Sequence, residues 1–207
     1  MGCCLVWDGC EGSIVELEAY AVEGDAACHT ATRQGSREFF AGNSAGTAYV
    51  YLNYGMYWLL NVLVKGGGGD GILLIRAMEP TVAVDRMLER RPVERIEDLC
   101  SGPGKLGRAL GIAGIDHGCP LTPEGWSDRG LATQRGFRPR PPGLDVEVIT
   151  DVRVGISKAA DRPWRFLWKG HSHLSVHPGK VRPPGRKTFP SDNSKSGRGS
   201  RSPRGLP

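Results

Sequence analysis

Several features that would assign a class to this protein at once are missing from its sequence. No apolar run approaches the roughly 20 residues that a helix needs to cross a bilayer. The first residues, MGCCLVWDGC, lack the basic and apolar segments of a secretory signal and the Ser or Thr of a myristoylation motif. The six cysteines form no C-x-x-C pair and have no regular histidine spacing. We therefore expect a cytoplasmic protein with reduced thiols, no bound metal and no membrane contact.

An excess of positive charge is also missing from most of the chain, although the net charge is +5. Residues 178–207 hold eight Lys or Arg and one acidic residue, a charge of +7, which leaves −2 for residues 1–177. The same segment is rich in Pro, Gly and Ser, a composition typical of disorder. We predict one domain over 1–177 and a disordered basic tail over 178–207. Charge favours nucleic-acid binding by the tail more than by the domain.

Strand patterns dominate the first part of the chain. GCCLVW and SIVELEAY flank an Asp-Gly pair, which is typical of a β-hairpin. The β-branched and aromatic segment TAYVYLNYGMYWLLNVLV predicts two further strands with a turn near Gly55. ILLIRAMEP is almost entirely apolar, so it predicts a buried strand that ends at Pro80. The polar stretch 21–46 is predicted to be irregular.

The second part of the sequence adds helices. VAVDRMLERR has helical spacing of its apolar residues, and GPGKLGRALGI places a proline at the start of a short helix. GLDVEVITDVRVGI and WRFLWKG predict late strands. Because helices are inserted among strands and do not alternate with them, we predict an α+β fold. It should be a single compact domain with a largely antiparallel curved β-sheet and peripheral helices.

The strand IVELEAY raises the question of function, because it carries two glutamates on one face. Strand alternation places Glu16, Glu18 and Tyr20 on the same side. The common explanation is a strand with one face in solvent. Tyr51 and Asn53 share a face in a second strand, and such groups in one cleft would suit a flat, polar-edged ligand such as a nucleobase. Tyrosine-rich strands are nevertheless more often packed sheet surface.

Four blocks in the order found here resemble the alkyladenine (3-methyladenine) DNA glycosylase family. They are IVELEAYAVEGDAACH, TAYVYLNYGMYWLLNVLV, ILLIRAMEP and LCSGPGKLGRALGI, followed by a weaker match in RVGI and RPWRFLWKG. The resemblance implies a monofunctional enzyme that flips alkylated purines out of double-stranded DNA and hydrolyses the N-glycosidic bond, leaving an abasic site. It implies no cofactor, a monomer and, in a bacterium, association with the nucleoid.

The resemblance also implies roles for individual residues. Glu18 corresponds to the general base that activates the attacking water, and Arg76 would help to hold that water. Tyr20 would lie against one face of the flipped base, with His29 and Tyr51 against the other. Without the resemblance, His29 would be an ordinary surface histidine. Arg76 would be a buried guanidinium that needs a carboxylate partner, for which Glu18 and Glu79 are the candidates.

Two further residues complete the implied site. Tyr54 corresponds to the tyrosine wedged into the duplex where the base leaves. Asn61 corresponds to the asparagine that crowds the amino group of guanine, although an asparagine in a strand commonly caps a turn or bonds a neighbouring strand. Glu16 has no role in this scheme, and we expect it to face solvent.

The sequence departs from the family pattern in two places. TRQGSREFF at residues 32–40 replaces the family's usual TPRN run, so no contacts are assigned to this segment. The helical segment that usually precedes the first strand has no counterpart, so either the start is truncated or this support for the domain is missing. Two alternatives stay open: a non-catalytic nucleic-acid-binding module on the same fold, or binding by the basic tail alone.

Overall fold

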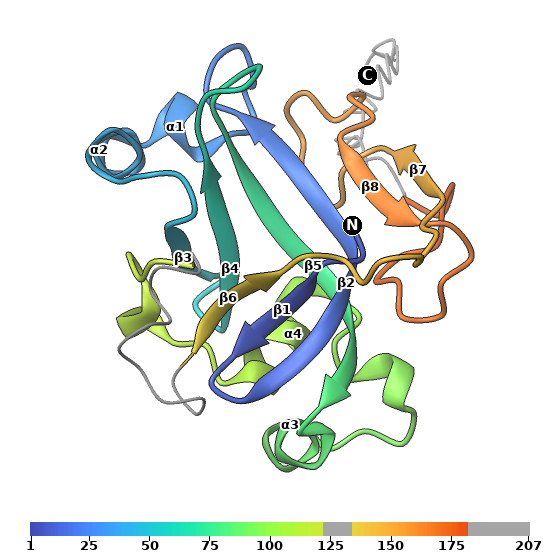
Figure 1. The fold of residues 1–207 in the computed structure, drawn as a ribbon. Helices are drawn as coiled ribbons and strands as arrows, with labels where there is room; N and C mark the ends of the chain where they lie inside the picture. Colours follow the sequence, from blue (N-terminus) through green and yellow to red (C-terminus); the bar gives the residue numbers. More distant parts are fainter. Residues whose placement is uncertain (122–133, 182–207) are drawn as a thin grey trace, which may run out of the picture.

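A curled antiparallel sheet organises the chain (Figure 1). The computed structural model describes residues 1–121 and 134–181. The strands of these residues are β1 (Cys4–Trp7), β2 (Cys10–Ala21), β3 (Ala48–Asn53), β4 (Tyr57–Val64), β5 (Gly71–Val82), β6 (Arg135–Arg138), β7 (Val148–Asp151) and β8 (Arg165–Trp168). They run β3-β4-β5-β2-β1-β6 across the sheet, and β8 joins β2 to β7. The predicted α+β fold with a largely antiparallel sheet is confirmed.

Strand β2 has partners on both edges. It pairs with β5 along nearly its whole length. Its other edge is divided, because residues 10–13 pair with β1 and residues 16–18 pair with β8. Main-chain bonding on both sides fixes the position of this strand and satisfies its polar backbone groups. The side chains at positions 16 to 18 are therefore held within the molecule and not at an edge.

Both predicted hairpin turns are confirmed. Asp8 and Gly9 connect β1 to β2 with positive φ angles of 48° and 81°, as a two-residue type I′ turn requires. Tyr54, Gly55 and Met56 connect β3 to β4, and the first two have φ angles of 51° and 68°. Glycine adopts this conformation readily, whereas a tyrosine adopts it at a cost. The second turn therefore presents Tyr54 in an uncommon backbone conformation at the tip of the hairpin.

The predicted end of the buried strand at Pro80 is wrong. β5 continues through Pro80 to Val82, and Pro80 lies opposite Gly12 of β2. The register between the two strands shifts between Glu11 and Gly12 at this point. A proline lacks the N–H that a regular ladder uses, but it is tolerated where the ladder is already interrupted by a bulge. The irregularity therefore allows the strand to continue.

Four α-helices lie in the described residues: α1 (His29–Thr32), α2 (Gln34–Gly42), α3 (Val84–Arg90) and α4 (Pro103–Leu110). The two helices predicted from VAVDRMLERR and GPGKLGRALGI are confirmed as α3 and α4, and α4 begins at Pro103. The prediction of an irregular stretch over 21–46 is wrong, because it contains α1 and α2. Only Ser36 and Phe40 of α2 are buried, so its apolar periodicity is too weak to be recognised.

The main core lies between the sheet and α4. It is built from large apolar side chains of the strands and of α4, including Trp7, Leu60, Met78 and Leu106. Gly107 of α4 lies against the main chain of β4: a Cβ at this position would be 2.2 Å from the carbonyl oxygen of Trp58. This close approach seats α4 on the β4 strand and so supports the β3–β4 hairpin.

The end of the domain differs from the prediction. The strand predicted from GLDVEVITDVRVGI is confirmed only over β7, after which residues 152–156 leave the sheet, whereas WRFLWKG contains β8 as predicted. β6 was not predicted, and it pairs with β1. Most of the predicted tail, residues 182–207, lies outside the described residues. No helix among the described residues is long and apolar enough to cross a membrane.

Candidate active site

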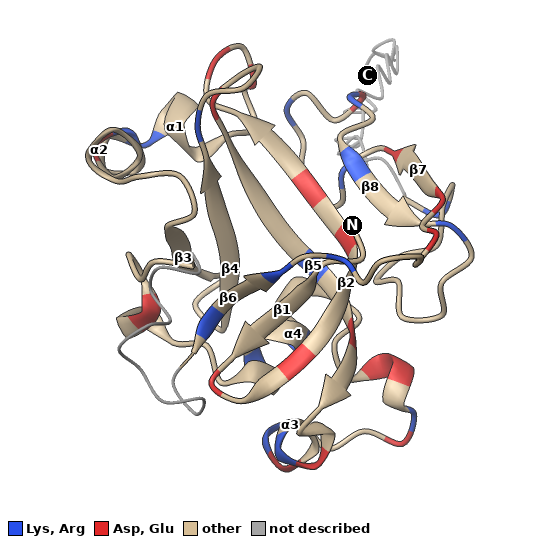
Figure 2. Cartoon of the chain, viewed as in Figure 1, with Lys and Arg blue, Asp and Glu red and all other residues tan. Residues whose placement is uncertain are grey.

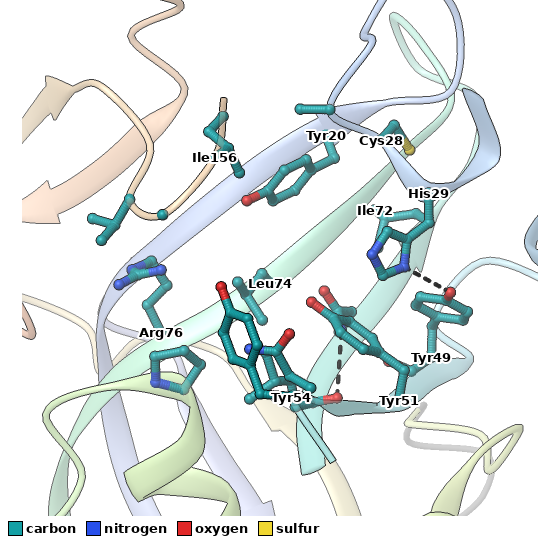
Figure 3. Close-up of a pocket in the computed structure, with 17 residues that line it drawn as sticks. Tyr20, Cys28, His29, Tyr49, Tyr51, Tyr54, Ile72, Leu74, Arg76 and Ile156 are labelled. Carbon is teal, nitrogen blue, oxygen red and sulfur yellow. Dashed lines mark hydrogen bonds between the residues drawn. The ribbon is translucent and has the colours of Figure 1, made fainter. Parts of the chain in front are cut away.

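A pocket of about 240 Å³ opens on one face of the sheet, between β2, the β3–β4 hairpin, β5 and the loop at residues 154–156 (Figure 3). Its lining is aromatic and aliphatic, with a few polar groups: Tyr20, Ala27, Cys28, His29, Tyr49, Tyr51, Asn53, Tyr54, Leu59, Asn61, Ile72, Leu74, Arg76, Pro103, Val154, Gly155 and Ile156. All the predicted site residues except Glu18 line this pocket. A concave cavity that combines aromatic side chains with hydrogen-bonding groups is typical of a small-ligand site.

Aromatic rings form opposite sides of the pocket. Tyr20 lies on one side, and Tyr51 lies on the other with His29 (Figure 3). The rings of His29 and Tyr51 are in edge contact, with centroids 4.5 Å apart. The space between Tyr20 and this pair can accept a flat ring whose faces contact aromatic side chains. The predicted grouping of these residues is therefore confirmed as a geometry, and their roles stay predictions.

His29 is an uncharged hydrogen-bonding group in this pocket. Its Nδ1 lies 2.9 Å from the hydroxyl of Tyr49, which in turn is 2.9 Å from the hydroxyl of Ser36. Burial, together with the positive charge of Arg33, lowers the pKa of His29 to about 4. The ring is neutral at pH 7, so it can either donate or accept a hydrogen bond at Nε2. Ser36 belongs to the segment that departs from the family pattern, and here it supports the histidine.

Glu18 lies directly beneath the pocket. Its side chain is fully buried and accepts hydrogen bonds from the Tyr20 hydroxyl (2.7 Å) and the Val154 amide (2.7 Å). Nη1 of Arg76 is 3.2 Å from the same carboxylate. All three partners line the pocket, so Glu18 is one side chain away from it. Hydrogen bonds and a cation of this kind stabilise an ionised carboxylate.

Tyr20 is the neutral partner in its contact with Glu18. Burial and the negative charge of Glu18 raise the pKa of the Tyr20 hydroxyl far above its usual value. The phenol therefore keeps its proton at any physiological pH and donates it to the carboxylate. This arrangement leaves Glu18 as an acceptor, which is the state that a general base requires.

The expectation that Glu16 faces solvent is wrong. Glu16 is fully buried. Figure 2 shows acidic residues along β2, which has neighbouring strands on both of its edges. One carboxylate oxygen is 2.8 Å from Nε of Arg76 and 3.1 Å from Nη1 of Arg165. The other accepts a 2.6 Å bond from the amide of Ser175, whose hydroxyl donates to the first oxygen at 2.7 Å. The covering groups come from β8 and the segment after it, roughly 150 residues along the chain.

Arg76 connects the two glutamates. Its Nε donates to Glu16, its Nη1 contacts Glu18, and its Nη2 donates to the hydroxyl of Ser175. Burial opposes the charge on Arg76, but Glu18 and Glu16 outweigh this effect and raise the pKa of the guanidinium. The side chain is therefore a fixed cation in the pocket lining. The sequence-based expectation that Arg76 needs a carboxylate partner is confirmed, and the partners are Glu16 and Glu18, not Glu79.

A buried ion pair that the sequence did not reveal fixes the loop next to Glu18. Arg153 and Asp25 are both fully buried at the side chain and form two hydrogen bonds of 2.5 and 2.9 Å. The guanidinium of Arg153 also lies over the Tyr20 ring, 4.6 Å from its centroid. Through this pair the loop presents the Val154 amide to Glu18. An arginine inside an apolar segment, VRVGI, was the signal that could have found it.

Asn61 and Tyr54 occupy different depths of the site. Asn61 is buried on β4 and donates through Nδ2 to the carbonyl oxygen of Tyr49, 3.0 Å away, across the β3–β4 pair. The amide therefore has a structural role in addition to its place in the pocket lining. Tyr54 lies at the mouth with 80% of its surface exposed. It is the most protruding aromatic residue of the lining.

Comparison with known proteins agrees with this arrangement. The methylpurine-DNA glycosylase family profile matches residues 1–172. The chain is 39% identical over 176 residues to a Rhodopseudomonas palustris protein named "Putative 3-methyladenine DNA glycosylase", covering 85% of this chain and 82% of the relative. A protein of the same name from Rubrobacter xylanophilus is 39% identical over 185 residues, covering 87% and 90% of the two chains. The chain therefore belongs to the methylpurine-DNA glycosylase family.

Proposed function

We propose that this protein is a monofunctional DNA glycosylase that removes alkylated purines of the 3-methyladenine type from double-stranded DNA. The observation that carries the proposal is the contact between a buried carboxylate and a fixed guanidinium, Glu18 and Arg76, at the floor of an aromatic pocket. The family membership of the chain supports the same reaction class. In this proposal the enzyme hydrolyses the N-glycosidic bond and leaves an abasic site.

The pocket is suited to an electron-poor flat ring. An alkylated purine carries positive charge, and the faces of Tyr20 and Tyr51 attract a cation placed between them. The neutral His29 can exchange a hydrogen bond with the edge of the base through Nε2. Since the alkylated base is already cationic, it leaves without strong acid assistance. The site then needs mainly a base for water.

Glu18 is the proposed base, with Arg76 as the group that orients the water. The water would accept a contact from Arg76 and donate a proton to a Glu18 oxygen, so that its oxygen attacks C1′ of the sugar. The bond from C1′ to the purine nitrogen breaks, and the bonding electron pair leaves with the base. Glu18 is fully buried beneath the pocket lining, so in this proposal the water enters between Tyr20 and Arg76 to reach a Glu18 oxygen.

Tyr54 is the proposed wedge. A base within a duplex cannot reach this pocket, so the nucleotide must rotate out of the stack, which costs a few kcal/mol. Tyr54 is exposed at the tip of a hairpin that α4 supports, next to the pocket mouth. A planar ring inserted there would stack on the neighbouring bases and fill the gap.

The test is direct release of the base. A duplex with one alkylated purine is incubated with excess enzyme, and free base is measured by chromatography, with the undamaged duplex as control. We expect free base from the damaged duplex alone, and an intact strand until alkali cleaves the abasic site. Binding of the lesion duplex without release of base would contradict the proposal and favour the non-catalytic binding module.

A further inference from the structure

We propose that Glu79, His171 and His173 form a binding site for one divalent transition-metal ion, with Zn²⁺ as the representative ion. The three residues lie outside the pocket described above, on β5 and on the segment that follows β8. The proposal does not depend on the proposed glycosylase function, because it rests on a separate cluster of side chains. It differs from the expectation from cysteine and histidine spacing that this chain has no metal site.

The donor atoms are already close together. One ligand atom from each residue lies within 4.8 Å of the others. Nε2 of His171 and Oε2 of Glu79 are 3.4 Å apart. Zinc bonds nitrogen and carboxylate oxygen at about 2.0–2.2 Å in tetrahedral geometry, which corresponds to ligand separations of about 3.4 Å. The His171–Glu79 pair has this separation, and small side-chain rotations bring His173 to it.

The backbone that carries these ligands is held in place. Glu79 belongs to β5, which pairs with β2. Leu174 follows His173 directly, and it is buried in a cluster with Ala77 and Leu167. His173 itself is buried, and the His171 ring contacts that of Trp168. A ligand set on a fixed strand and a fixed segment loses little entropy when a metal binds.

The hydrogen bonds of the two imidazoles leave Nε2 for the metal. The hydroxyl of Ser172 lies 3.2 Å from Nδ1 of His173, which is the outer contact that orients metal-bound histidines. Nδ1 of His171 accepts a long bond of 3.3 Å from the amide of His173. Coordination through Nε2 of His171 moves the ring proton to Nδ1 and gives up this long bond. We therefore expect a site of moderate affinity.

The donor set selects the class of ion. Imidazole nitrogens suit zinc, cobalt, nickel and copper, whereas magnesium and calcium prefer oxygen ligands. Glu79 is partly exposed, with 42% of its side chain accessible, so a water molecule can reach the metal as a further ligand. A site with two histidines, one carboxylate and water is expected to bind Zn²⁺ and Co²⁺.

The ion would fasten the segment 171–175 to β5. Ser175 belongs to this segment and holds both Glu16 and Arg76. Arg76 and Glu79 belong to the same strand, so the ion would stabilise the cover over the ion pairs beneath the pocket. The expected role is structural. Metal bound only to the folded chain raises its thermal stability.

The test is metal binding by the full chain without an affinity tag, after treatment with a chelator and in the absence of DNA. We expect calorimetry to show one Zn²⁺ per chain, a higher Tm with Zn²⁺, and visible Co²⁺ bands typical of tetrahedral coordination. Glu79→Gln and His171→Asn change partly exposed side chains and should fold. Each should weaken binding about 100-fold or more, beyond the effect of losing an outer-shell partner.

The matched control is His177→Asn, because His177 is close in sequence but outside the cluster. This variant should bind Zn²⁺ as the original chain does. Binding without one-to-one stoichiometry, or the same loss in His177→Asn as in Glu79→Gln, would overturn the proposal. Because binding is measured without DNA, its failure is distinct from a failure to release base.

Discussion

Glu16 and Glu18 are two residues apart on one face of β2, yet their carboxylates contact different groups. Glu16 is held between Arg76 and Arg165 and is covered by Ser175, and of these partners only Arg76 lines the pocket. Glu18 shares Arg76 but is otherwise bonded to Tyr20 and to the Val154 amide, both in the pocket lining. Glu16 is therefore enclosed by charged partners, whereas Glu18 is bonded to groups that line the pocket.

The difference shows what decides the role of a buried carboxylate. Both side chains are fully buried and both contact Arg76. Glu16 has Arg165 as a second arginine partner, so two guanidinium groups balance its charge. Glu18 has neutral donors for the rest of its contacts, and a water or ligand can replace one of these at small cost.

The largest expected effect on stability is from Glu16→Gln. Removing this charge leaves Arg165 and Arg76 with one carboxylate fewer, and breaking a buried pair typically costs about 3–5 kcal/mol. We expect the free energy of unfolding in urea to fall by about this amount, and by about 1 kcal/mol for Glu18→Gln, whose partners are mostly neutral donors. Equal losses for the two variants would remove the distinction between them.

A smaller effect is expected from the acid titration of His29. Its pKa is about 4 in the folded chain and about 6.5 when unfolded, so the unfolded state binds more protons between these values. Stability is complete above pH 6.5 and decreases as the pH falls toward 4. Over this range the free energy of unfolding of His29→Asn should fall by about 1–2 kcal/mol less than that of the original chain. This difference is smaller than the shift in pKa alone implies, because the ring is partly exposed to solvent. Urea unfolding at pH 4.5 and 7 measures the difference, and an unchanged acid slope would contradict it.

The smallest effect on stability is expected at Tyr54. The side chain is 80% exposed, so Tyr54→Ala should change the free energy of unfolding by no more than about 0.5 kcal/mol. Binding to a lesion-containing duplex should nevertheless weaken more than binding to an undamaged one, because only flipping leaves a gap to fill. Tyr54→Phe keeps the flat ring and should bind the lesion duplex nearly as well. An equal loss on both duplexes would argue against a wedge.

Local signals predicted much of the fold. The Asp8-Gly9 pair located the first hairpin, Gly55 located the second, and Pro103 marked the start of α4. These features depend on a few adjacent residues, whose conformational preferences the sequence shows directly. Pro80 misled because its tolerance in β5 depends on a shift of register against the neighbouring strand β2.

The errors at the site have a different cause. Strand alternation placed Glu16 correctly on the face of Glu18, but it could not show that Arg165 and Ser175 cover that face. The Asp25–Arg153 pair also joins residues 128 positions apart. An arginine in a nearly apolar strand, such as Arg76, does indicate that carboxylates must be close. The family resemblance identified the pocket residues, whereas periodicity alone could not rank the two glutamates.

The most direct test of the central claim is single-turnover excision by Glu18→Gln on an alkylated duplex at saturating enzyme. The matched control is Glu23→Gln, because Glu23 is exposed just beyond β2. We expect Glu18→Gln to bind the lesion duplex nearly as tightly as the original chain does. Its rate of base release should be lower by a factor of about 100 or more. The control should keep the original rate. Excision by Glu18→Gln at the rate of the control would show that Glu18 is not the base.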